Sequence, residues 1–367
     1  MAKGLNELSK NILEFCLSPD LGGLELCAYD YFKFFKTQSS SFLCVARNKK
    51  LDKYVNNESK FTLKRNKFFP IIPAIKLAKF IDENEIDVIH FHWTRDITTV
   101  VLAKILAKRK AIVIQSRHMT MTRFKDDFYH KWLYKNIDII HAVTYQVKEQ
   151  LQKFIPQNVQ PKLEMIYLGV SEPTIDMKVV EMLKEKHTLG DAFIVGIIGR
   201  IEKGKGQYLL IDALTHIREL NIKVLVIGHS MDELYVDELK EKIKNLGMED
   251  KFIFTGFTKN INEYFELCDV SVLATKKETF GLVVIESMLN KVPVIASNNG
   301  GPLEIIDDMK DGLLFDRTAV DLSKKVTLLY ENKELRNILS VNGYQKIKNK
   351  FDKETQMKKM LRLINES

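Results

Sequence analysis

The feature that most constrains this chain is a regular alternation of short apolar segments with longer amphipathic ones, repeated in two runs. In the first run the segments NILEFCL, SSFLCVA, DVIHFHW, AIVIQSR and IDIIHAVT are apolar and rich in β-branched residues. In the second run FIVGIIG, KVLVIG, FIFTGF, VSVLAT and VPVIAS have the same character, and stretches such as YVDELKEKIKNLG separate them. Short buried strands separated by helices are typical of parallel sheets with helices on both faces. The sequence therefore predicts two doubly wound α/β domains.

The length and one interruption of the pattern place the domain boundary. A chain of 367 residues is too long for one ordinary hydrophobic core. Gly169, Pro173 and nearby polar residues break the alternation, which predicts a Rossmann-like domain over 1–172 and a second over 173–350. Because open α/β sheets bind ligands beyond the carboxyl ends of their strands, we expect a site in a cleft between two facing domains, built from the loops that follow strands.

Charge is distributed unevenly along the chain. Residues 1–175 carry 27 Lys and Arg against 18 Asp and Glu, a net charge of +9, whereas the remainder carries 29 against 30. A basic half indicates an anionic partner, such as an anionic membrane face, a phosphorylated lipid or a nucleic acid. The alternative is that solvated lysine-rich faces keep the protein soluble.

Hydropathy and cysteine usage bear on the compartment. No run of eighteen uncharged apolar residues occurs, and the N-terminal segment does not resemble a signal peptide, so we expect a cytoplasmic protein. The cysteines show neither C-x-x-C spacing nor a nearby pair of histidines; they are Cys16, Cys27, Cys44 and Cys268. We expect buried, reduced thiols and no metal site.

The segment ETFGLVVIE follows the predicted strand VSVLAT and continues into a helix. Gly281 would let the backbone approach a ligand where the free N–H groups of Phe280, Gly281 and Leu282 face an anion. Glu278, before the helix, can accept hydrogen bonds from sugar hydroxyls, and Glu286 can accept two from a ribose diol. The alternative is one glutamate that stabilises its own helix and another that is solvated.

The segment GIIGRIEKGKGQ also follows a predicted strand. From Gly199 to Lys205 it satisfies most of a Walker A loop, but Gly206 stands where that loop needs Ser or Thr. In a second interpretation Arg200 and Lys205 converge on a diphosphate, and two fixed cations balance the charge that grows on a departing nucleoside diphosphate. A solvated basic turn is the remaining alternative.

Four further segments follow predicted strands. Gly22 and Gly23 in SPDLGGLE permit φ > 0 and an unhindered backbone against a ligand, or form only a turn. His118, after VIQSR, could bind a donor sugar hydroxyl or orient the acceptor. The two histidines of HFHW are interpreted as mostly structural, with Trp93 as a stacking surface for the acceptor. The turn in NNGGPLEII is expected to shape the donor pocket.

Together these segments resemble the retaining glycosyltransferases of family 4, which have the GT-B fold of two Rossmann-like domains. The resemblance covers nearly the whole chain and is most specific from Gly196 to Phe315, where GRIEKGKGQYLLIDAL, FTGF, CDVSVLAT, ETFGLVVIESM and VPVIASNNGGPLEII stand in the family's order. In the first half GGLE, DVIHFH and the histidine after VIQSR match. Two positions depart: Leu168 replaces an asparagine that is frequent at the interdomain turn, and Met119 follows the histidine where relatives often have an acidic or small residue.

The resemblance implies a role for each candidate residue. It assigns Glu278 to the transferred sugar, Glu286 to the ribose, Arg200 and Lys205 to the diphosphate, and His118 to the neighbourhood of the reacting sugar. It assigns further donor contacts to Gly22, Gly23, Gly199, Phe257, Thr258, Phe280, Gly281 and Leu282. It also implies that a C-terminal helix over about 351–367 packs back on the first domain.

The resemblance implies hexosyl transfer with retention through an oxocarbenium-like transition state. No enzymic nucleophile is evident, so a front-face displacement fits, with the leaving phosphate oxygen taking the proton of the acceptor. It implies no metal and no cofactor besides the nucleotide sugar, with a UDP-sugar as the commonest donor. A glycan or lipid-linked acceptor of surface polysaccharide or lipopolysaccharide assembly is expected, with the basic half in peripheral contact with the inner face of an anionic membrane.

Three alternatives stay open from the sequence. A P-loop hydrolase would show strong dependence on magnesium. A nucleic-acid-binding protein would use the basic half, although no recognition helix or aromatic-basic RNA motif is present, and we expect no nucleic acid as partner. A non-hydrolysing nucleotide-sugar epimerase would consume the donor without an acceptor.

Overall fold

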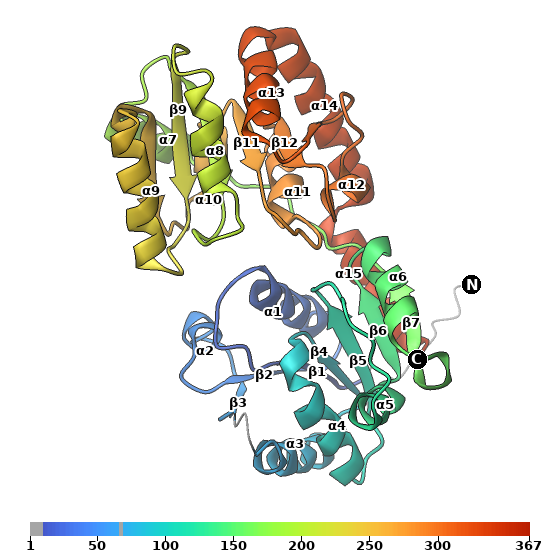
Figure 1. Ribbon diagram of the computed structural model, residues 1–367. Helices are drawn as coiled ribbons and strands as arrows, with labels where there is room; N and C mark the ends of the chain where they lie inside the picture. The colour runs from blue at the N-terminus through green and yellow to red at the C-terminus, as the bar shows by residue number, and fades with distance from the viewer. Residues whose placement is uncertain (1–9, 66–68) are drawn as a thin grey trace, which may run out of the picture. The chain divides into compact units, whose positions relative to one another are not determined.

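Each half of the chain folds into its own parallel sheet. The computed structural model describes residues 10–65 and 69–367, and Figure 1 labels its elements. The chain divides into two units: unit 1 runs to Tyr167 and resumes at Thr355, and unit 2 comprises Leu168–Glu354. The first nine residues of the expected domain 1–172 lie outside the described part of the chain. The predicted fold class, two parallel sheets flanked by helices, is confirmed.

The sheet of unit 1 has seven parallel strands in the order β3-β2-β1-β4-β5-β6-β7. Successive strands run outward from β1 to β3, and the chain then crosses to β4 on the other side of β1. The point between β1 and β4 is therefore the topological switch point of this sheet. The strands are β1 Ile12–Cys16, β2 Ser41–Ala46, β3 Phe61–Leu63, β4 Val88–Phe91, β5 Ile112–Arg117, β6 Ile139–Ala142 and β7 Lys162–Met165.

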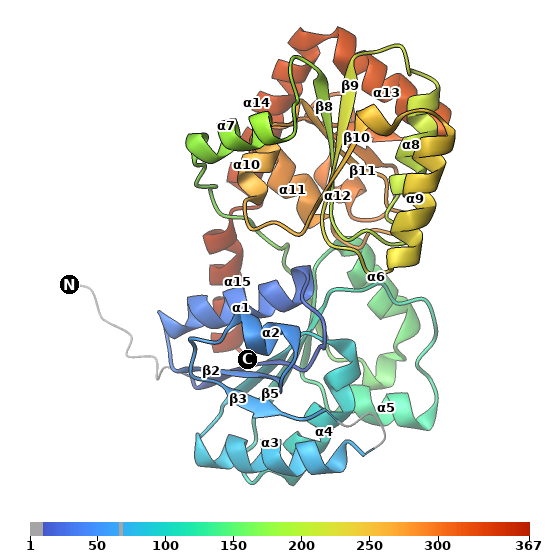
Figure 2. The ribbon, with the colours of Figure 1, turned by 90° about the vertical axis from the view of Figure 1, so that its left-hand side faces the viewer.

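Helices cover both faces of this sheet (Figure 2). One face packs against α3, α4, α5 and α6 through a large apolar cluster, and the other packs against α1 and α15. The helix α15 brings Met357 and Met360 against Ile12 of β1 and Ile139 of β6, so the C-terminal segment is part of unit 1. The helices are α1 Gly23–Lys36, α2 Lys50–Tyr54, α3 Ile71–Glu83, α4 Ile97–Leu106, α5 Phe128–Lys135, α6 Tyr145–Phe154 and α15 Lys353–Asn365, with 3-10 turns at Thr94–Asp96 and Gln157–Val159.

The sheet of unit 2 has six parallel strands in the order β10-β9-β8-β11-β12-β13. Its switch point lies between β8 and β11, which pair directly through Val195 with Val270 and Gly196 with Ser271. A glycine at 196 is required there, because a Cβ would lie 2.6 Å from Sγ of Cys268. The strands are β8 Phe193–Ile198, β9 Ile222–Ile227, β10 Phe252–Gly256, β11 Val270–Leu273, β12 Val294–Ser297 and β13 Leu313–Phe315.

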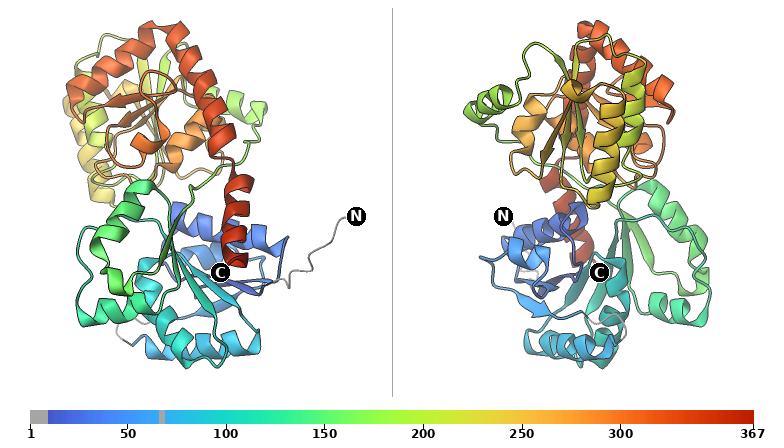
Figure 3. Two further views of the ribbon diagram at one scale, coloured as in Figure 1. Left: turned by 90° about the vertical axis from the view of Figure 1, so that its right-hand side faces the viewer. Right: turned by 60° about the vertical axis from the view of Figure 1, so that its left-hand side comes forward.

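Helices cover both faces of the second sheet as well (Figure 3). The helices α8, α9 and α13 contribute to one apolar cluster, and α7 and α10 to another that uses the alternate residues of β8 and β9. The helices are α7 Met177–Lys186, α8 Gln207–Thr215, α9 Glu233–Asn245, α10 Ile261–Glu266, α11 Leu282–Leu289, α12 Pro302–Ile305, α13 Ala319–Glu331 and α14 Lys333–Lys350, with a 3-10 turn at Glu249–Lys251.

Three short strands were not anticipated from the sequence. They are β3, β7 and β13, each at an edge of its sheet. An edge strand is covered on fewer sides, so it needs less apolar sequence; β7, for example, is partly exposed along its length.

Candidate functional site

The predicted donor residues of unit 2 lie in loops at the carboxyl end of its sheet. The loop 199–206 follows β8, and the loop 274–281 follows β11. Because β8 and β11 flank the switch point, these two loops stand side by side where open α/β sheets bind ligands. The backbone N–H of Lys276 donates to the carbonyl of Gly204 at 2.8 Å and ties one loop to the other.

Glycines fix the shape of the first loop. Gly204 and Gly206 have φ of +99° and +94°, in the left-handed region that favours glycine. A Cβ at Gly206 would also lie 2.4 Å from the Cβ and carbonyl oxygen of Ala274. A serine or threonine at 206 would meet the same clash, so the hydroxyl that a Walker A loop needs cannot stand here. The P-loop interpretation therefore fails on backbone geometry.

A glycine pair after β12 supports the second loop. The N–H of Gly301 donates to the carbonyl of Glu278 at 3.0 Å. A Cβ at Gly300 would lie 1.9 Å from the Glu278 carbonyl oxygen, and one at Gly301 would lie 2.1 Å from that of Phe280. The expected turn in NNGGPLEII thus holds the backbone on which Glu278 stands. Gly281, with φ +98°, then caps α11, and the first N–H groups of this helix face out at the same edge.

The structure brings Lys205 and Glu278 together. The ammonium of Lys205 lies 3.4 Å from Oε2 of Glu278, and the two side chains are 28% and 17% exposed. Both side chains remain partly exposed, so their two charges are accessible to a ligand. The guanidinium of Arg200 instead pairs with Glu202 at 3.0 Å. The convergence of Arg200 with Lys205 on a diphosphate stays a prediction.

Glu286 lies further along α11 and is partly buried. Burial raises the pKa of its carboxyl to about 7, and the positive charge of Lys353 opposes this shift. The folded protein therefore keeps this carboxyl protonated at pH values at which the unfolded chain, with its ordinary pKa of about 4.3, has lost the proton. The stability that the protonated carboxyl contributes is lost as the pH rises through 7. Once ionised, this carboxylate has two oxygens that can accept hydrogen bonds from a diol.

The remaining donor candidates of unit 2 stand near the end of β10. Phe257 is 62% exposed, and its ring approaches that of His229 edge-on at 6.3 Å between centroids. Thr258 accepts a hydrogen bond from the N–H of Asn260. The loop after β9 also belongs to this edge: a Cβ at Gly228 would lie 1.8 Å from the carbonyl oxygen of Gly199. The sequence analysis did not single out this loop, although it too directly follows a predicted strand.

The expectation for Gly22 and Gly23 needs correction. Gly22 has φ −160°, an extended conformation that any residue can adopt, and positive φ is found at neither glycine. The pair begins α1 after β1, so the turn interpretation describes the backbone, while the small size of glycine still leaves the backbone uncovered.

His118 stands in a buried row of polar side chains that the sequence analysis missed. Its Nε2 lies 3.1 Å from Nδ1 of His92, and Nε2 of His92 lies 2.6 Å from Oε2 of Glu14. Tyr31 of α1 stacks on His92 at 5.8 Å. His92 and Glu14 are fully buried, and His118 is partly exposed. The chain of contacts therefore runs from the carboxyl edge of the sheet into its interior.

The row continues across the sheet of unit 1. The other carboxylate oxygen of Glu14, Oε1, lies 2.7 Å from Nδ1 of His90. Nε2 of His90 lies 2.7 Å from Oγ of Ser116, which lies 2.6 Å from Nδ1 of His141. Nε2 of His141 reaches the carbonyl of Ile166 at 2.7 Å. We call Glu14, His90, His92, Ser116, His118 and His141 the polar chain.

Burial controls the ionisation of the polar chain. Loss of solvent lowers the pKa of both His90 and His118 to about 3 and that of His141 to about 4, and it raises the pKa of Glu14 well above its usual value. The residues of the polar chain alternate with apolar residues on strands that are buried on both faces. A polar residue at such a position was the signal that could have revealed them.

Two other features of unit 1 bear on the expectations. The ring of Trp93 already has two cationic neighbours, with the guanidinium of Arg65 4.5 Å from its centroid and that of Arg95 5.6 Å away, and its role as a stacking surface stays a prediction. Cys27 is partly exposed, unlike the other three cysteines. It also lies beside His92 and His118, although the sequence shows no histidine near it.

Two groups of side chains in unit 1 lie close enough together to surround an ion: Glu14 with His90 and His92, and Cys27 with His92 and His118. In the first group, both carboxylate oxygens and the facing nitrogens already share hydrogen bonds of 2.6 and 2.7 Å. In the second, the two histidines bond each other. We interpret both as a hydrogen-bonded network.

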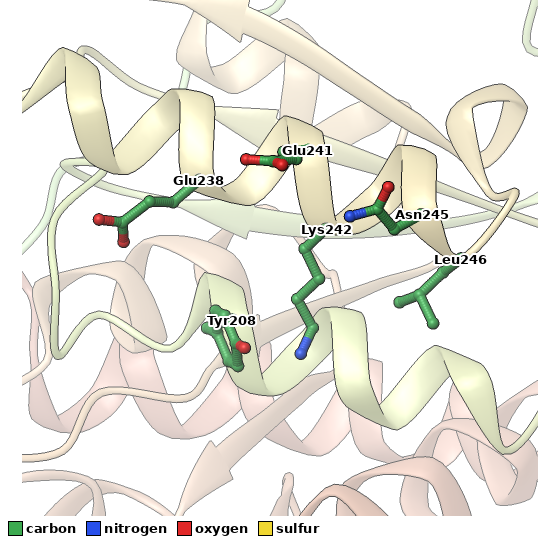
Figure 4. Close-up of a pocket in the computed structure, with 6 residues that line it drawn as sticks. All are labelled: Tyr208, Glu238, Glu241, Lys242, Asn245 and Leu246. Atoms are coloured by element: carbon green, nitrogen blue, oxygen red, sulfur yellow. The ribbon is translucent and has the colours of Figure 1, made fainter.

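Unit 2 also has a shallow hollow of about 440 Å³ (Figure 4). It is formed by α8 and α9, and Lys242 reaches across it to lie 3.6 Å over the ring of Tyr208. No predicted site residue lines it. Separately, within 10–65 and 69–367, no helix has both the length and the hydropathy needed to cross a bilayer.

Comparison with known proteins agrees with this geometry. Residues 22–172 match the sequence model of Glycosyltransferase Family 4, and residues 180–346 match that of Glycosyl transferases group 1. The chain is 27% identical over 366 residues to the putative glycosyltransferase EpsD of Bacillus subtilis, covering 92% of this chain and 91% of that protein. It is 29% identical over 177 residues to the capsular polysaccharide biosynthesis glycosyltransferase CapM of Staphylococcus aureus, covering 47% and 46%.

A solved structure shows the same fold along the chain. The crystal structure of Anabaena Alr3699/HepE in complex with UDP and glucose superposes with a TM-score of 0.85, at 20% identity, over 98% of this chain and 100% of that one. The two matched segments together span most of the sequence, and both sheets have the expected parallel order. This chain belongs to the family 4 glycosyltransferases of the GT-B fold.

Proposed function

We propose that this glycosyltransferase moves a hexosyl group, with retention, from a nucleoside diphosphate sugar to a glycan or lipid-linked acceptor. The observation that carries the proposal is the pairing of Lys205 with Glu278 at the switch point of unit 2. A cation and a carboxylate 3.4 Å apart offer complementary contacts to a diphosphate and to sugar hydroxyls. The complex of HepE with UDP and glucose supports UDP as the nucleotide.

The side chains have separate tasks in this proposal. Lys205 leaves Glu278 for the diphosphate, and Glu278 then accepts hydrogen bonds from the transferred sugar. Arg200 must leave Glu202 to add a second positive charge. The N–H groups at Gly281 and Leu282 add the partial positive charge of a helix N-terminus. These groups supply counter-charge for the leaving nucleoside diphosphate, so the proposal needs no metal ion.

The reaction is a front-face displacement. The bond between the anomeric carbon and the phosphate oxygen breaks, and its electron pair stays on the departing nucleoside diphosphate. The acceptor hydroxyl attacks from the same face and gives its proton to the leaving phosphate oxygen. A new glycosidic bond forms with the configuration retained. Fixed positive charges stabilise the leaving group most strongly in the transition state, which is the condition for catalysis.

Donor binding gives the direct test of this function. At a hundred times its Kd, a ligand that binds only the folded protein raises the free energy of unfolding by about 2.7 kcal/mol. We expect a UDP-sugar to produce such a thermal shift without added metal, and Lys205→Ala to abolish it. A panel of nucleotide sugars measured by differential scanning fluorimetry, with and without EDTA, checks both. A shift only with magnesium, or with none of the panel, contradicts the proposal.

Product analysis separates the remaining alternative. An epimerase converts the donor sugar without an acceptor, whereas a transferase releases nucleoside diphosphate in proportion to the glycosylated acceptor. Incubation of donor alone, followed by chromatography, distinguishes them. Binding of duplex DNA that weakens with salt, without any response to nucleotide sugars, would favour the nucleic-acid alternative.

We propose further that unit 1 contacts an anionic membrane, where an acceptor for surface polysaccharide or lipopolysaccharide is held. Four apolar side chains at the start of α3 are more than half exposed: Phe69, Ile71, Ile72 and Ile75. This part of the chain carries the net positive charge. Exposed apolar residues beside basic ones favour binding to an anionic lipid surface. The relationship to CapM supports a role in polysaccharide assembly.

Vesicle binding tests this surface. The double variant Ile71→Ser/Ile72→Ser should lose at least about tenfold in affinity for vesicles that contain anionic lipid, because each buried methylene contributes about 0.8 kcal/mol. The matched control is Ile338→Ser/Val341→Ser, which removes two exposed apolar side chains from α14 in unit 2. Cosedimentation measures both. Equal binding by the two variants contradicts the assignment.

A further inference from the structure

The polar chain of unit 1 contains six hydrogen bonds in sequence, and each bond needs one proton. One end is the carbonyl of Ile166, which can only accept. Nε2 of His141 must therefore carry a proton. If His141 is neutral, its Nδ1 is bare, that is, unprotonated, and accepts a hydrogen bond from the hydroxyl of Ser116. Oγ of Ser116 then accepts from Nε2 of His90, which leaves Nδ1 of His90 bare.

The remaining bonds run from His90 through Glu14 and His92 to His118, which is partly exposed, and the unprotonated Nδ1 of His90 determines their directions. A bare Nδ1 on His90 needs a proton from Oε1 of Glu14, so this carboxyl must be the neutral acid. Its other oxygen then accepts from Nε2 of His92, whose bare Nδ1 accepts from Nε2 of His118. Nδ1 of His118 is left unprotonated. Six protons on four neutral histidines, one serine and one carboxylic acid satisfy all six bonds.

No other arrangement in which every group is uncharged satisfies every bond. Moving the proton of the Glu14–His90 bond onto His90 keeps all six bonds but creates a buried ion pair, and burial lowers the pKa of His90 to about 3 while it raises that of Glu14. With Glu14 ionised and all histidines neutral, five protons remain for six bonds, and one buried pair is left without a proton. Reversing the chain so that His118 is protonated at Nδ1 requires a proton on both nitrogens of His141, which is an imidazolium buried among apolar residues. Burying such a charge without a counter-ion is costly.

We propose that Glu14 is a positioning residue, held as the neutral acid, that orders this chain so that His118 presents a bare Nδ1 as acceptor to a ligand hydroxyl. The part of the inference that concerns the ligand rests on the proposed function. Glu14 touches no ligand itself and acts through His92.

The groups that face Glu14 support its neutral state. From α1 this is Tyr31, and the pKa of its hydroxyl is raised, mainly by burial. From β2, Leu43 is the paired neighbour. From α15, Met357 and Met360 pack in the apolar cluster on this face of the sheet; Lys358 and Lys359 of that helix are exposed, and the positive charge of Lys353 acts on Glu286. In 10–65 and 69–367, no Lys or Arg forms an ion pair with Glu14.

The geometry makes Glu14→Gln a sharp test. The amide of glutamine is a neutral isostere: its NH₂ donates to Nδ1 of His90, and its oxygen accepts from Nε2 of His92. The variant therefore reproduces the arrangement of a protonated Glu14. Had Glu14 been ionised, accepting two N–H groups, the amide would place a donor against a donor and lose one of the two bonds.

The pH dependence of the unfolding equilibrium measures directly whether Glu14 holds a proton in the folded protein. In unfolded chains Glu ionises near pH of about 4.3, so between that pH and its raised folded pKa the folded protein holds one proton more. The stability of the wild type then falls with rising pH relative to Glu14→Gln, because glutamine does not titrate. We expect the ratio of the unfolding constants, wild type over Glu14→Gln, to rise by up to about tenfold per pH unit above pH of about 5, until the pH reaches the raised folded pKa of Glu14.

Urea titrations with tryptophan fluorescence can make this measurement, because both tryptophans, Trp93 and Trp132, belong to unit 1. Other titrating groups are common to both proteins and cancel in the ratio. A ratio that is constant above pH 5, with Glu14→Gln the less stable protein, would overturn the proposal.

Activity tests the positioning role separately. Glu14→Leu removes the bond that orders His92, and we expect kcat to fall about tenfold, the value of one oriented hydrogen bond. Glu14→Gln should rescue most of this loss. The matched control is Gln115→Leu: Gln115 is fully buried in β5, and its amide atoms make no hydrogen bond in the described structure. This control should leave kcat unchanged, and equal loss in both leucine variants contradicts the role of Glu14.

Two further readouts separate the inference from the proposed function. Long-range proton–nitrogen NMR of protein labelled in its eight histidines reports which ring nitrogens are bare, with His118→Gln to assign its signal. A protonated Nδ1 on His118, or stoichiometric zinc by elemental analysis, would overturn the inference. If no nucleotide sugar is turned over by the wild type, the proposed function fails while the NMR and the unfolding ratio still decide the state of Glu14.

Discussion

Replacing either Lys205 or Glu278 by alanine is expected to lower kcat at least about a hundredfold while the protein stays folded. A single preorganised contact to charge that develops in the transition state is worth this much. Lys205 supplies positive charge for the departing diphosphate, and Glu278 holds the sugar. Because both side chains remain partly exposed and solvent screens the pair, its loss should cost at most about 1 kcal/mol of stability. Steady-state kinetics with circular dichroism measures both effects.

A lysine in the same loop provides the matched control. Lys203 is 66% exposed and pairs with Glu238 of α9, away from Glu278. Lys203→Ala removes the same charge from the same loop and should change kcat by less than about twofold, since surface ion pairs contribute little. If Lys203→Ala and Lys205→Ala lose activity equally, then general electrostatics rather than a contact at Lys205 explains the loss.

Gly300→Ala is expected to lower both the stability and the activity of the protein. The residue has φ +66°, and a Cβ would lie 1.9 Å from the carbonyl oxygen of Glu278. The left-handed backbone costs about 1 kcal/mol with a side chain, and the overlap adds about 1–3 kcal/mol more. Since the backbone of Glu278 must move to relieve it, we also expect kcat/KM to fall at least about tenfold. Thermal unfolding and kinetics measure the two losses.

Gly247→Ala isolates the steric part of this effect. Gly247 has nearly the same backbone conformation, φ +64°, but its Cβ would meet no atom within 4 Å. It should lose only the conformational cost of about 1 kcal/mol and retain activity. If the two alanine variants unfold at the same temperature with the same activity, the turn at Gly300 does not support the Glu278 loop as described.

The parts of the fold that the sequence predicted are those in which local pattern and burial agree. The strands beside each switch point, such as β1 and β8, are fully or largely buried, and their sequences are apolar apart from Glu14 in β1. The edge strand β7 has a mixed sequence because it is partly exposed, so its pattern did not indicate a strand. The loops carrying Lys205 and Glu278 were predicted because each directly follows a buried strand.

The polar chain could not be predicted from local sequence, because its bonds join distant residues. Glu14 and His90 are 76 positions apart and become neighbours only through the pairing of β1 with β4. Single polar residues within apolar strands gave the only indication. For Gly22, the sequence indicated a candidate site residue but not the conformation of its backbone, since glycine permits positive φ without requiring it. The pairing of Arg200 with Glu202 likewise depends on rotamers that no spacing reveals.

The central claim is that a nucleoside diphosphate sugar binds unit 2 through Lys205, Glu278 and the start of α11. A crystal structure of the protein with a bound nucleotide sugar tests it most directly. The account predicts a phosphate oxygen about 2.7–3.2 Å from Nζ of Lys205, with the backbone N–H of Leu282 facing the ligand and Glu278 bonded to a sugar hydroxyl. A diphosphate bound elsewhere, with Lys205 still paired to Glu278, would contradict it.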